Sequence, residues 1–308
     1  MVRALGVDPV GTAGDGRGYL LVDVALPWPR AVSAMAGLAP VLAAADVTGL
    51  RVQATVPAPG AAHRVVAHRH REEHPGWFAG YERVEVEVAP GDVVEAAVAL
   101  AANNPGGTPT AALDVLVCAH GARDVCCGSG GTALALALLA DDLPGVRVAR
   151  TSHTGGHRFA PTAFVLPTGT AWAHADIDLL RRVLARAGPL DDLLARYRGS
   201  TGIGLAPAQA AERATFAAVG WSWLDRRRRA TVGGDGAVVV EADGGDDGHR
   251  AWRVEVAPGK AAPVPDCGQP LSPTTKTERQ WLVTGVEEVP PPNGGHASGA
   301  PRGDGVRP

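Results

Sequence analysis

Soft metal ligands are concentrated in two short segments near the middle of the chain. The first, Cys118 to Gly128, holds three of the four cysteines, and the second, Ser152 to His157, places two histidines four positions apart. Thiolate sulfur with imidazole nitrogen is the ligand set of zinc, copper or an iron–sulfur centre, and not of magnesium or calcium. The sequence therefore predicts a soft-metal or iron–sulfur site, provided that the fold brings the two segments together.

The histidine segment reads as a clamping loop. Gly155 and Gly156 stand between the two histidines, and paired glycines favour a turn with positive φ over a helix. No glutamate lies between the histidines, so the zinc-protease motif is absent.

The spacing of the cysteines bears on the kind of centre. Eight residues separate Cys118 from Cys127, whereas the cysteines of a structural zinc site usually have two to four residues between them. The wider spacing suits a larger object such as a 2Fe–2S cluster, for which two cysteines on one iron and two histidines on the other form the Rieske ligand set. A tetrahedral zinc site with two cysteines and two histidines stays open as the alternative.

The elements that must position these segments follow a thioredoxin-like order. A strand–helix–strand unit, a β-hairpin and a helix are predicted at 113–117, 132–139, 146–149, 163–166 with 171–173, and 177–187. The same order is predicted upstream at 19–24, 31–45, 50–56, 63–67 with 82–88, and 93–102. We hypothesise two related α/β lobes, with the site in the second, where the loop after the first strand meets the loop before the hairpin.

The two segments closely resemble the sucrase/ferredoxin-like family. The resemblance rests on Cys118-Ala119-His120-Gly121-Ala122-Arg123-Asp124-Val125-Cys126-Cys127-Gly128 and on His153-Thr154-Gly155-Gly156-His157-Arg158-Phe159-Ala160. It implies a thioredoxin-like ferredoxin domain that carries a 2Fe–2S cluster and transfers electrons. Carried over position by position, the resemblance assigns the cluster ligands as Cys118, Cys127, His153 and His157.

The neighbours of these ligands receive supporting roles in the prediction. Cys127 is preferred to Cys126 as a ligand because the family's ligand directly precedes a glycine. The residues expected around the cluster, without binding it, are His120, Arg123, Asp124, Cys126 and Arg158. Pro161 occupies the position of the cis-proline of thioredoxins. The "sucrase" part of the family name has no support here, since no carboxylate pair can be placed across a glycosidic bond.

The predicted organisation has four parts. Residues 1–108 form an N-terminal α/β lobe without a site, and residues 109–190 form the thioredoxin-like ferredoxin domain. Residues 191–289 form a region of helix and antiparallel β-structure, and residues 290–308, rich in Pro, Gly and Ser, form a disordered tail. The histidines between His68 and His74 are predicted to lie in a polar loop, and Arg226 to Arg229 to be a solvated helix end.

The predicted function is that of an electron carrier rather than a hydrolase. Neutral imidazole ligands raise a cluster's potential to about −150 to +300 mV, against about −400 mV for plant-type ferredoxins, and their outer N–H groups can couple electrons to protons. Two alternatives are a zinc-stabilised binding module and a thiol oxidoreductase using Cys126 and Cys127. The last is disfavoured because adjacent cysteines form a strained disulfide.

Net charge, cysteine count and the length of the apolar runs indicate which partners and which compartment to expect. A net charge of −3 and a pI near 6.4 argue against nucleic acid or an anionic membrane as the main partner. The predicted electron transfer instead implies a redox protein as partner, which the sequence does not identify. Four cysteines are too few for a secreted disulfide framework, and the longest apolar run, Ala133 to Ala140, is too short to span a bilayer. We therefore expect a cytoplasmic protein with reduced thiols.

Overall fold

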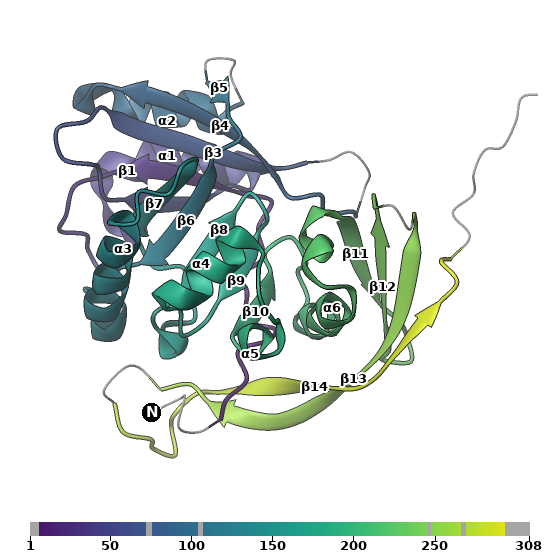
Figure 1. Cartoon of the computed structure of the whole chain (residues 1–308). Coiled ribbons are helices and arrows are strands. Elements are labelled where there is room, and N and C mark those ends of the chain that lie inside the picture. Colours follow the sequence, from purple (N-terminus) through teal and green to yellow (C-terminus); the bar gives the residue numbers. More distant parts are fainter. Residues whose placement is uncertain (1–5, 72–75, 104–106, 246–247, 266–268, 293–308) are drawn as a thin grey trace, which may run out of the picture.

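The computed structural model describes residues 6–71, 76–103, 107–245, 248–265 and 269–292 (Figure 1). Most strands belong to one mixed ten-stranded sheet with the order β10-β9-β8-β6-β7-β2-β1-β3-β4-β5. A separate four-stranded antiparallel sheet has the order β11-β12-β13-β14. The predicted α/β class with a C-terminal antiparallel region is thus confirmed.

The first lobe supplies one half of the large sheet. In chain order its elements are β1 (Gly18–Asp23), α1 (Ala39–Thr48), β2 (Arg51–Thr55), β3 (His63–His70), β4 (Tyr81–Val88) and α2 (Val93–Ala101). β1 pairs with β2 in parallel and with β3 antiparallel, and β3 pairs antiparallel with β4. Helix α1 begins later than predicted, with Pro40 in its first turn, and two short 3₁₀ turns at Val32–Ala34 and Ala36–Leu38 precede it.

The second lobe repeats this arrangement. Its elements are β6 (Leu113–Cys118), α3 (Thr132–Leu139), β7 (Val146–Thr151), β8 (Ala163–Leu166), β9 (Thr170–Trp172) and α4 (Ile177–Ala185). β6 pairs in parallel with β7 and antiparallel with β8, and β8 pairs antiparallel with β9. The strand order β7-β6-β8-β9 therefore matches β2-β1-β3-β4 of the first lobe, as expected of two related lobes.

The lobes join edge to edge. β2 meets β7 antiparallel through the pair Thr55 and Thr151, so the two half-sheets form one sheet and are related by an approximate two-fold rotation. Short strands extend both outer edges: β5 (Thr108–Pro109) lies beside β4, and β10 (Tyr197–Ser200) lies beside β9.

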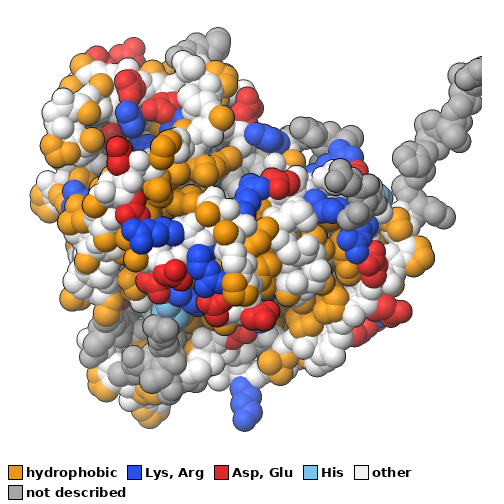
Figure 2. All heavy atoms as spheres, viewed as in Figure 1, with side chains coloured by type: hydrophobic (Ala, Val, Ile, Leu, Met, Phe, Trp, Pro, Cys, Tyr) orange, Lys and Arg blue, Asp and Glu red, His pale blue; other side chains and the backbone are white. Residues whose placement is uncertain are grey.

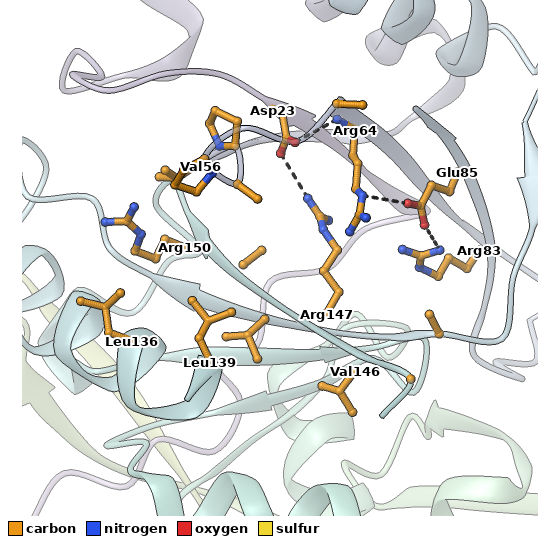
Figure 3. Close-up of a pocket in the computed structure, with 18 residues that line it drawn as sticks. Asp23, Val56, Arg64, Arg83, Glu85, Leu136, Leu139, Val146, Arg147 and Arg150 are labelled. Atoms are coloured by element: carbon orange, nitrogen blue, oxygen red, sulfur yellow. Dashed lines mark hydrogen bonds and ion pairs between the residues drawn. The ribbon is translucent and has the colours of Figure 1, made fainter. Parts of the chain in front are cut away.

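Buried charges bridge the lobes beside this seam. The Arg147 guanidinium reaches from β7 to Asp23 of β1 at 3.2 Å (Figure 3) and donates to Asp114 of β6 at 3.1 Å. His68 and Arg83 approach the same Asp114 carboxylate at 2.8 Å and 2.7 Å. The polar loop predicted around His68 is therefore wrong, because His68 is a buried residue of β3 with a buried acid as its partner, and His74 lies outside the described residues.

The C-terminal region packs α6 (Ala206–Val219) against the small sheet, whose strands are β11 (Arg227–Val232), β12 (Val238–Asp243), β13 (Arg250–Pro263) and β14 (Thr277–Val289). A short helix, α5 (Asp191–Leu194), precedes β10. The arginine run is not a solvated helix end: Arg226 follows a 3₁₀ helix (Trp221–Asp225) but is buried, and Arg227 to Arg229 lie in β11. In that strand, alternation buries Arg228 against Glu212 at 3.0 Å and leaves Arg227 to pair with Asp243.

The long hairpin of β13 and β14 curves under the molecule, toward the N-terminal segment (Figure 1). Near its far end, Ala262 packs with Val7 and Phe159, and Glu278 pairs with Arg158 of the histidine segment. The hairpin thus extends from α6 to the predicted metal site. Most of the predicted disordered tail, residues 293–308, lies outside the described residues.

Surface charges of both signs are interspersed over the face shown in Figure 2, without a continuous basic patch there. Within the described part of the chain, no helix combines the length and apolar character needed to cross a bilayer.

Candidate metal centre

The cysteine segment begins where β6 ends. Cys118 is the last residue of the strand, and Cys127 opens a π-helical turn, Cys127–Gly131, that leads into α3. The glycines in this turn permit close backbone contact: a Cβ on Gly128 would lie 2.5 Å from the Cα of Gly121, and one on Gly131 would overlap the carbonyl oxygen of Cys118. Small residues are therefore what bring both cysteines to the same edge of the sheet.

The histidine segment connects β7 to β8 and forms the predicted turn. Gly155 and Gly156 have φ values of 87° and 69°, and a short 3₁₀ turn follows at His157–Phe159. The Ala160–Pro161 peptide bond is cis, as predicted from the thioredoxin order. The hydroxyls of Thr154 and Thr162 lie 3.0 Å apart across the base of the loop.

The two segments meet, and three predicted ligands converge. The sulfurs of Cys118 and Cys127 and a ring nitrogen of His153 all lie within 4.8 Å of one another. The Cys118 Sγ is 4.0 Å from Nδ1 of His153, both cysteines are buried, and neither is in a disulfide. Three soft donors at this separation can hold a metal.

His157, the fourth predicted ligand, lies beside this group without joining it. Its ring centroid is 5.8 Å from that of His153, and its Nδ1 is 3.2 Å from Oδ2 of Asp124. The other oxygen of Asp124 accepts hydrogen bonds from the backbone N–H groups of Cys126 and Cys127 at 2.9 Å and 3.2 Å. Asp124 therefore ties the cysteine turn to the histidine loop.

His120 connects the two loops through its ring. Nδ1 accepts a hydrogen bond from the backbone N–H of His153 at 3.2 Å, and Nε2 lies 2.9 Å from the carbonyl oxygen of Pro29. Burial lowers the pKa of His120, although the contact with Pro29 opposes the shift. A neutral ring protonated on Nε2 satisfies both contacts, so His120 holds the loop that carries His153.

The two free cysteines shift each other's pKa in opposite directions. A hydrogen bond from the Cys127 thiol lowers the pKa of Cys118 well below its usual value, although burial opposes this effect, and His153 lowers it further. The same hydrogen bond, together with burial, raises the pKa of Cys127. The pair thus favours the thiolate form of Cys118 over that of Cys127, and a metal that takes both sulfurs must displace the protons that they carry.

Cys126 differs from its neighbours because it is disulfide-bonded. The expectation that the cysteines are reduced is therefore wrong for this residue, and its sulfur is not an alternative to that of Cys127 as a thiolate ligand. Cys267, which stands alone among prolines and a glycine, lies outside the described residues.

The comparison with protein families agrees with the motif. The model of the sucrase/ferredoxin-like family matches residues 21–199, more than half of the chain and all of both site segments. The chain belongs to the sucrase/ferredoxin-like family. No curated protein and no solved structure matches it.

In this sucrase/ferredoxin-like protein, two arginines from outside the motif hold the histidine loop, and no local sequence pattern pointed to either. Arg51 of β2 donates to the carbonyl oxygen of His153 at 2.8 Å, and Arg198 of β10 donates to that of Gly155 at 3.2 Å. Both contacts join residues far apart in the chain, so only the sheet order could have revealed them.

The remaining predicted neighbours line a cavity beside the site. Arg123 and Arg158, with His157, line a polar cavity of about 560 Å³ between the histidine loop and the far end of the β13–β14 hairpin. The Arg158 guanidinium also stacks over the Phe159 ring at 4.4 Å. One side of the site therefore opens toward small polar molecules or a partner surface.

Proposed function

We propose that this protein binds a 2Fe–2S cluster through Cys118, Cys127, His153 and His157 and serves as an electron carrier. The observation that carries the proposal is the convergence of two free, buried cysteines with His153, and with His157 on the same loop. Two thiolates and two imidazoles are the ligand set of a Rieske-type cluster.

Asp124 supports the inclusion of His157 among the ligands. Metal-bound histidines commonly place their second ring nitrogen against a carboxylate, which fixes the ring and makes it a better donor. Asp124 already lies 3.2 Å from one nitrogen of His157, so that ring has a suitable partner and a second nitrogen for iron.

The cluster would supply one-electron chemistry, and the surrounding residues determine which of its sides is shielded from water. Buried Cys118 and Cys127 shield the thiolate side from water, while His157 lines the polar cavity. Electrons would therefore exchange on the histidine side, where a proton can accompany them. If each transfer carries one proton, the potential falls by about 59 mV per pH unit, and a redox titration between pH 6 and 10 that shows a flat potential would contradict this coupling.

We place the partner among redox proteins of the cytoplasm. The two free ligand cysteines favour a reducing compartment, whereas a disulfide such as that of Cys126 is rare in one. The mixed surface charge on the face in Figure 2 gives no basis for nucleic acid or membrane as partner there.

A single zinc ion is the second candidate, and one distance favours it. With Zn–S near 2.3 Å and Zn–N near 2.0–2.1 Å, tetrahedral sulfur and nitrogen ligands lie about 3.5 Å apart, close to the 4.0 Å between Cys118 and His153. A thiol oxidoreductase using Cys126 and Cys127 has no such support, because Cys126 is disulfide-bonded and Cys127 is free.

Metal analysis decides between the candidates. The protein is purified without air, and iron, acid-labile sulfide and zinc are measured beside its visible spectrum. We expect brown protein with two irons and two sulfides per chain. Colourless protein with one zinc and no sulfide would replace the electron carrier with the zinc-stabilised module.

A further inference from the structure

Arg198 is a fully buried cation directly behind the histidine loop. Its side chain is about 1% exposed, and its three nitrogens donate to the hydroxyl and carbonyl oxygens of Thr12 and to the carbonyl oxygen of Gly155. All three acceptors are neutral. Each nitrogen of the guanidinium has one acceptor, but none of these acceptors offsets its charge.

The position of Arg198 also explains a glycine of the motif. A Cβ on Gly156 would lie 2.7 Å from the guanidinium carbon and from Nη2, and Gly156 has a positive φ of 69°. The loop between the two histidines therefore has a glycine where the arginine lies against its backbone. Any side chain there would push the cation away from the site.

The lack of an acid beside Arg198 sets it apart from two other buried arginines, Arg83 and Arg228. Across the described ranges no carboxylate pairs with it, whereas Arg228 pairs with Glu212, and Arg83 with Asp114. A buried cation without a counter-charge is costly. Burial lowers the pKa of Arg198 to about 10, the cations Arg158 and Arg51 lower it further, and Cys118 is among the anions that oppose the shift.

The contact of Arg198 lies between the two predicted histidine ligands. Gly155, whose carbonyl oxygen accepts from Arg198 at 3.2 Å, is two residues from both His153 and His157. The buried cation is therefore held against the loop that carries both histidines.

We propose that the counter-charge of Arg198 is the iron–sulfur cluster itself, and that this arginine positions the histidine loop and raises the cluster's reduction potential. The proposal rests on the proposed function. With two thiolates and two neutral imidazoles the oxidised cluster has no net charge, and one electron makes it an anion. A fixed buried cation stabilises that anion more than the neutral form, and so favours reduction.

The experiment compares Arg198→Gln with Arg198→Lys by redox titration and electron paramagnetic resonance of the reduced protein. We expect Arg198→Gln to lower the equilibrium constant for reduction at least tenfold, which is about 59 mV for one electron. Arg198→Lys, which keeps the charge, should recover more than half of the shift. Arg147→Gln, a change to an arginine already offset by two carboxylates, is the matched control and should stay within twofold.

The outcomes separate this proposal from the proposed function. Wild-type protein without iron and sulfide would overturn both. Cluster-loaded Arg198→Gln with an unchanged potential, or an Arg198→Lys shift as large as that of Arg198→Gln, would overturn the role of the charge alone. If Arg198→Gln does not fold, Arg51→Gln takes its place. Arg51 is a more exposed cation that donates to the carbonyl oxygen of His153, so its loss should lower the reduction potential by less. An unchanged potential would contradict the proposal.

Discussion

The two lobes share one topology but use corresponding positions for different chemistry. The last residue of each lobe's first strand lies opposite the last residue of its second strand: Asp23 opposite Thr55, and Cys118 opposite Thr151. In the first lobe, Asp23 accepts hydrogen bonds from Thr55 at 2.6 Å and from Arg147 (Figure 3). In the second lobe, the corresponding Cys118 belongs to a group of soft donors. The same position of the fold thus carries a carboxylate that pairs with an arginine in one lobe and a thiol that can bind metal in the other.

The approximate two-fold relation extends to arginines that cross the seam. Arg147 of the second lobe reaches Asp23 of the first, and Arg51 of the first reaches the His153 carbonyl of the second. At the first position the cation meets a carboxylate and forms a closed ion pair beside a cavity of about 630 Å³. At the second, half-buried Arg51 donates to a backbone oxygen and pairs with no carboxylate among the described residues, near buried Arg198, which also lacks one. Such an excess of positive charge is expected where an anionic group is to be bound.

The largest effect should come from exchanging ligand chemistry at these corresponding positions. Cys118→Ser should remove at least nine-tenths of the bound iron and sulfide, because a hydroxyl is a poor substitute for a thiolate. Asp23→Asn, the change at the corresponding residue of the first lobe, should leave the iron content unchanged. Loss of iron in both variants would mean that the first lobe also takes part in binding.

Replacing a histidine ligand should keep the cluster and change its potential. His153→Cys adds a thiolate and its negative charge, so the potential should fall by roughly 100 mV or more toward the all-cysteine range. Redox titration measures the shift, and His249→Cys, the same change at a histidine between β12 and β13 and outside both site segments, serves as the control. A zinc site would bind zinc in the His153→Cys variant and show no redox signal.

The ion pairs around Asp114, between the two lobes, should affect the free energy of unfolding but not the reduction potential of the cluster. Asp114→Asn leaves His68, Arg83 and Arg147 around a neutral amide, so the free energy of unfolding should fall by about 3–5 kcal/mol. Urea unfolding measures this loss. The potential of the cluster-loaded variant should match wild type, and a shifted potential would show that the two regions are coupled.

Asp114 should also make the stability of the fold depend on pH, which is a smaller effect. Burial alone would raise the pKa of Asp114, but the hydrogen bond from His68 and the charges of Arg147 and Arg83 lower it overall. A carboxyl group with a lowered folded pKa stabilises the fold above its ordinary pKa near 3.9, and this stabilisation is lost as the pH falls below that value. Unfolding measured from pH 6 down to 3 should show a steeper loss in wild type than in Asp114→Asn; equal slopes would contradict the assignment.

The parts of the fold predicted correctly are those with a local cause. Alternating Val and Glu predicted β4, and the run of alanines and leucines after Thr132 predicted α3. The two glycines between His153 and His157 predicted a turn with positive φ, which the structure has. Local periodicity and turn chemistry were sufficient for these elements.

The parts that were missed depend on long-range contacts. The arginine run of β11 looks like a solvated surface until Glu212 of α6 is placed beneath Arg228. His68 looks like a loop residue until Asp114 of the other lobe pairs with it. Arg51 and Arg198 reach the site from strands about 100 residues and about 40 residues away, as the sequence separations of their hydrogen bonds to His153 and Gly155 show. Only tertiary structure gives these residues their partners.

Pulsed electron paramagnetic resonance of the reduced, anaerobically prepared protein tests the central claim most directly. Ligation by His153 and His157 predicts hyperfine couplings from two directly bound nitrogens in wild type and from one in His157→Ala. A reduced cluster without bound nitrogen, or protein that holds no paramagnetic iron at all, would contradict the assignment of these four residues to a 2Fe–2S cluster.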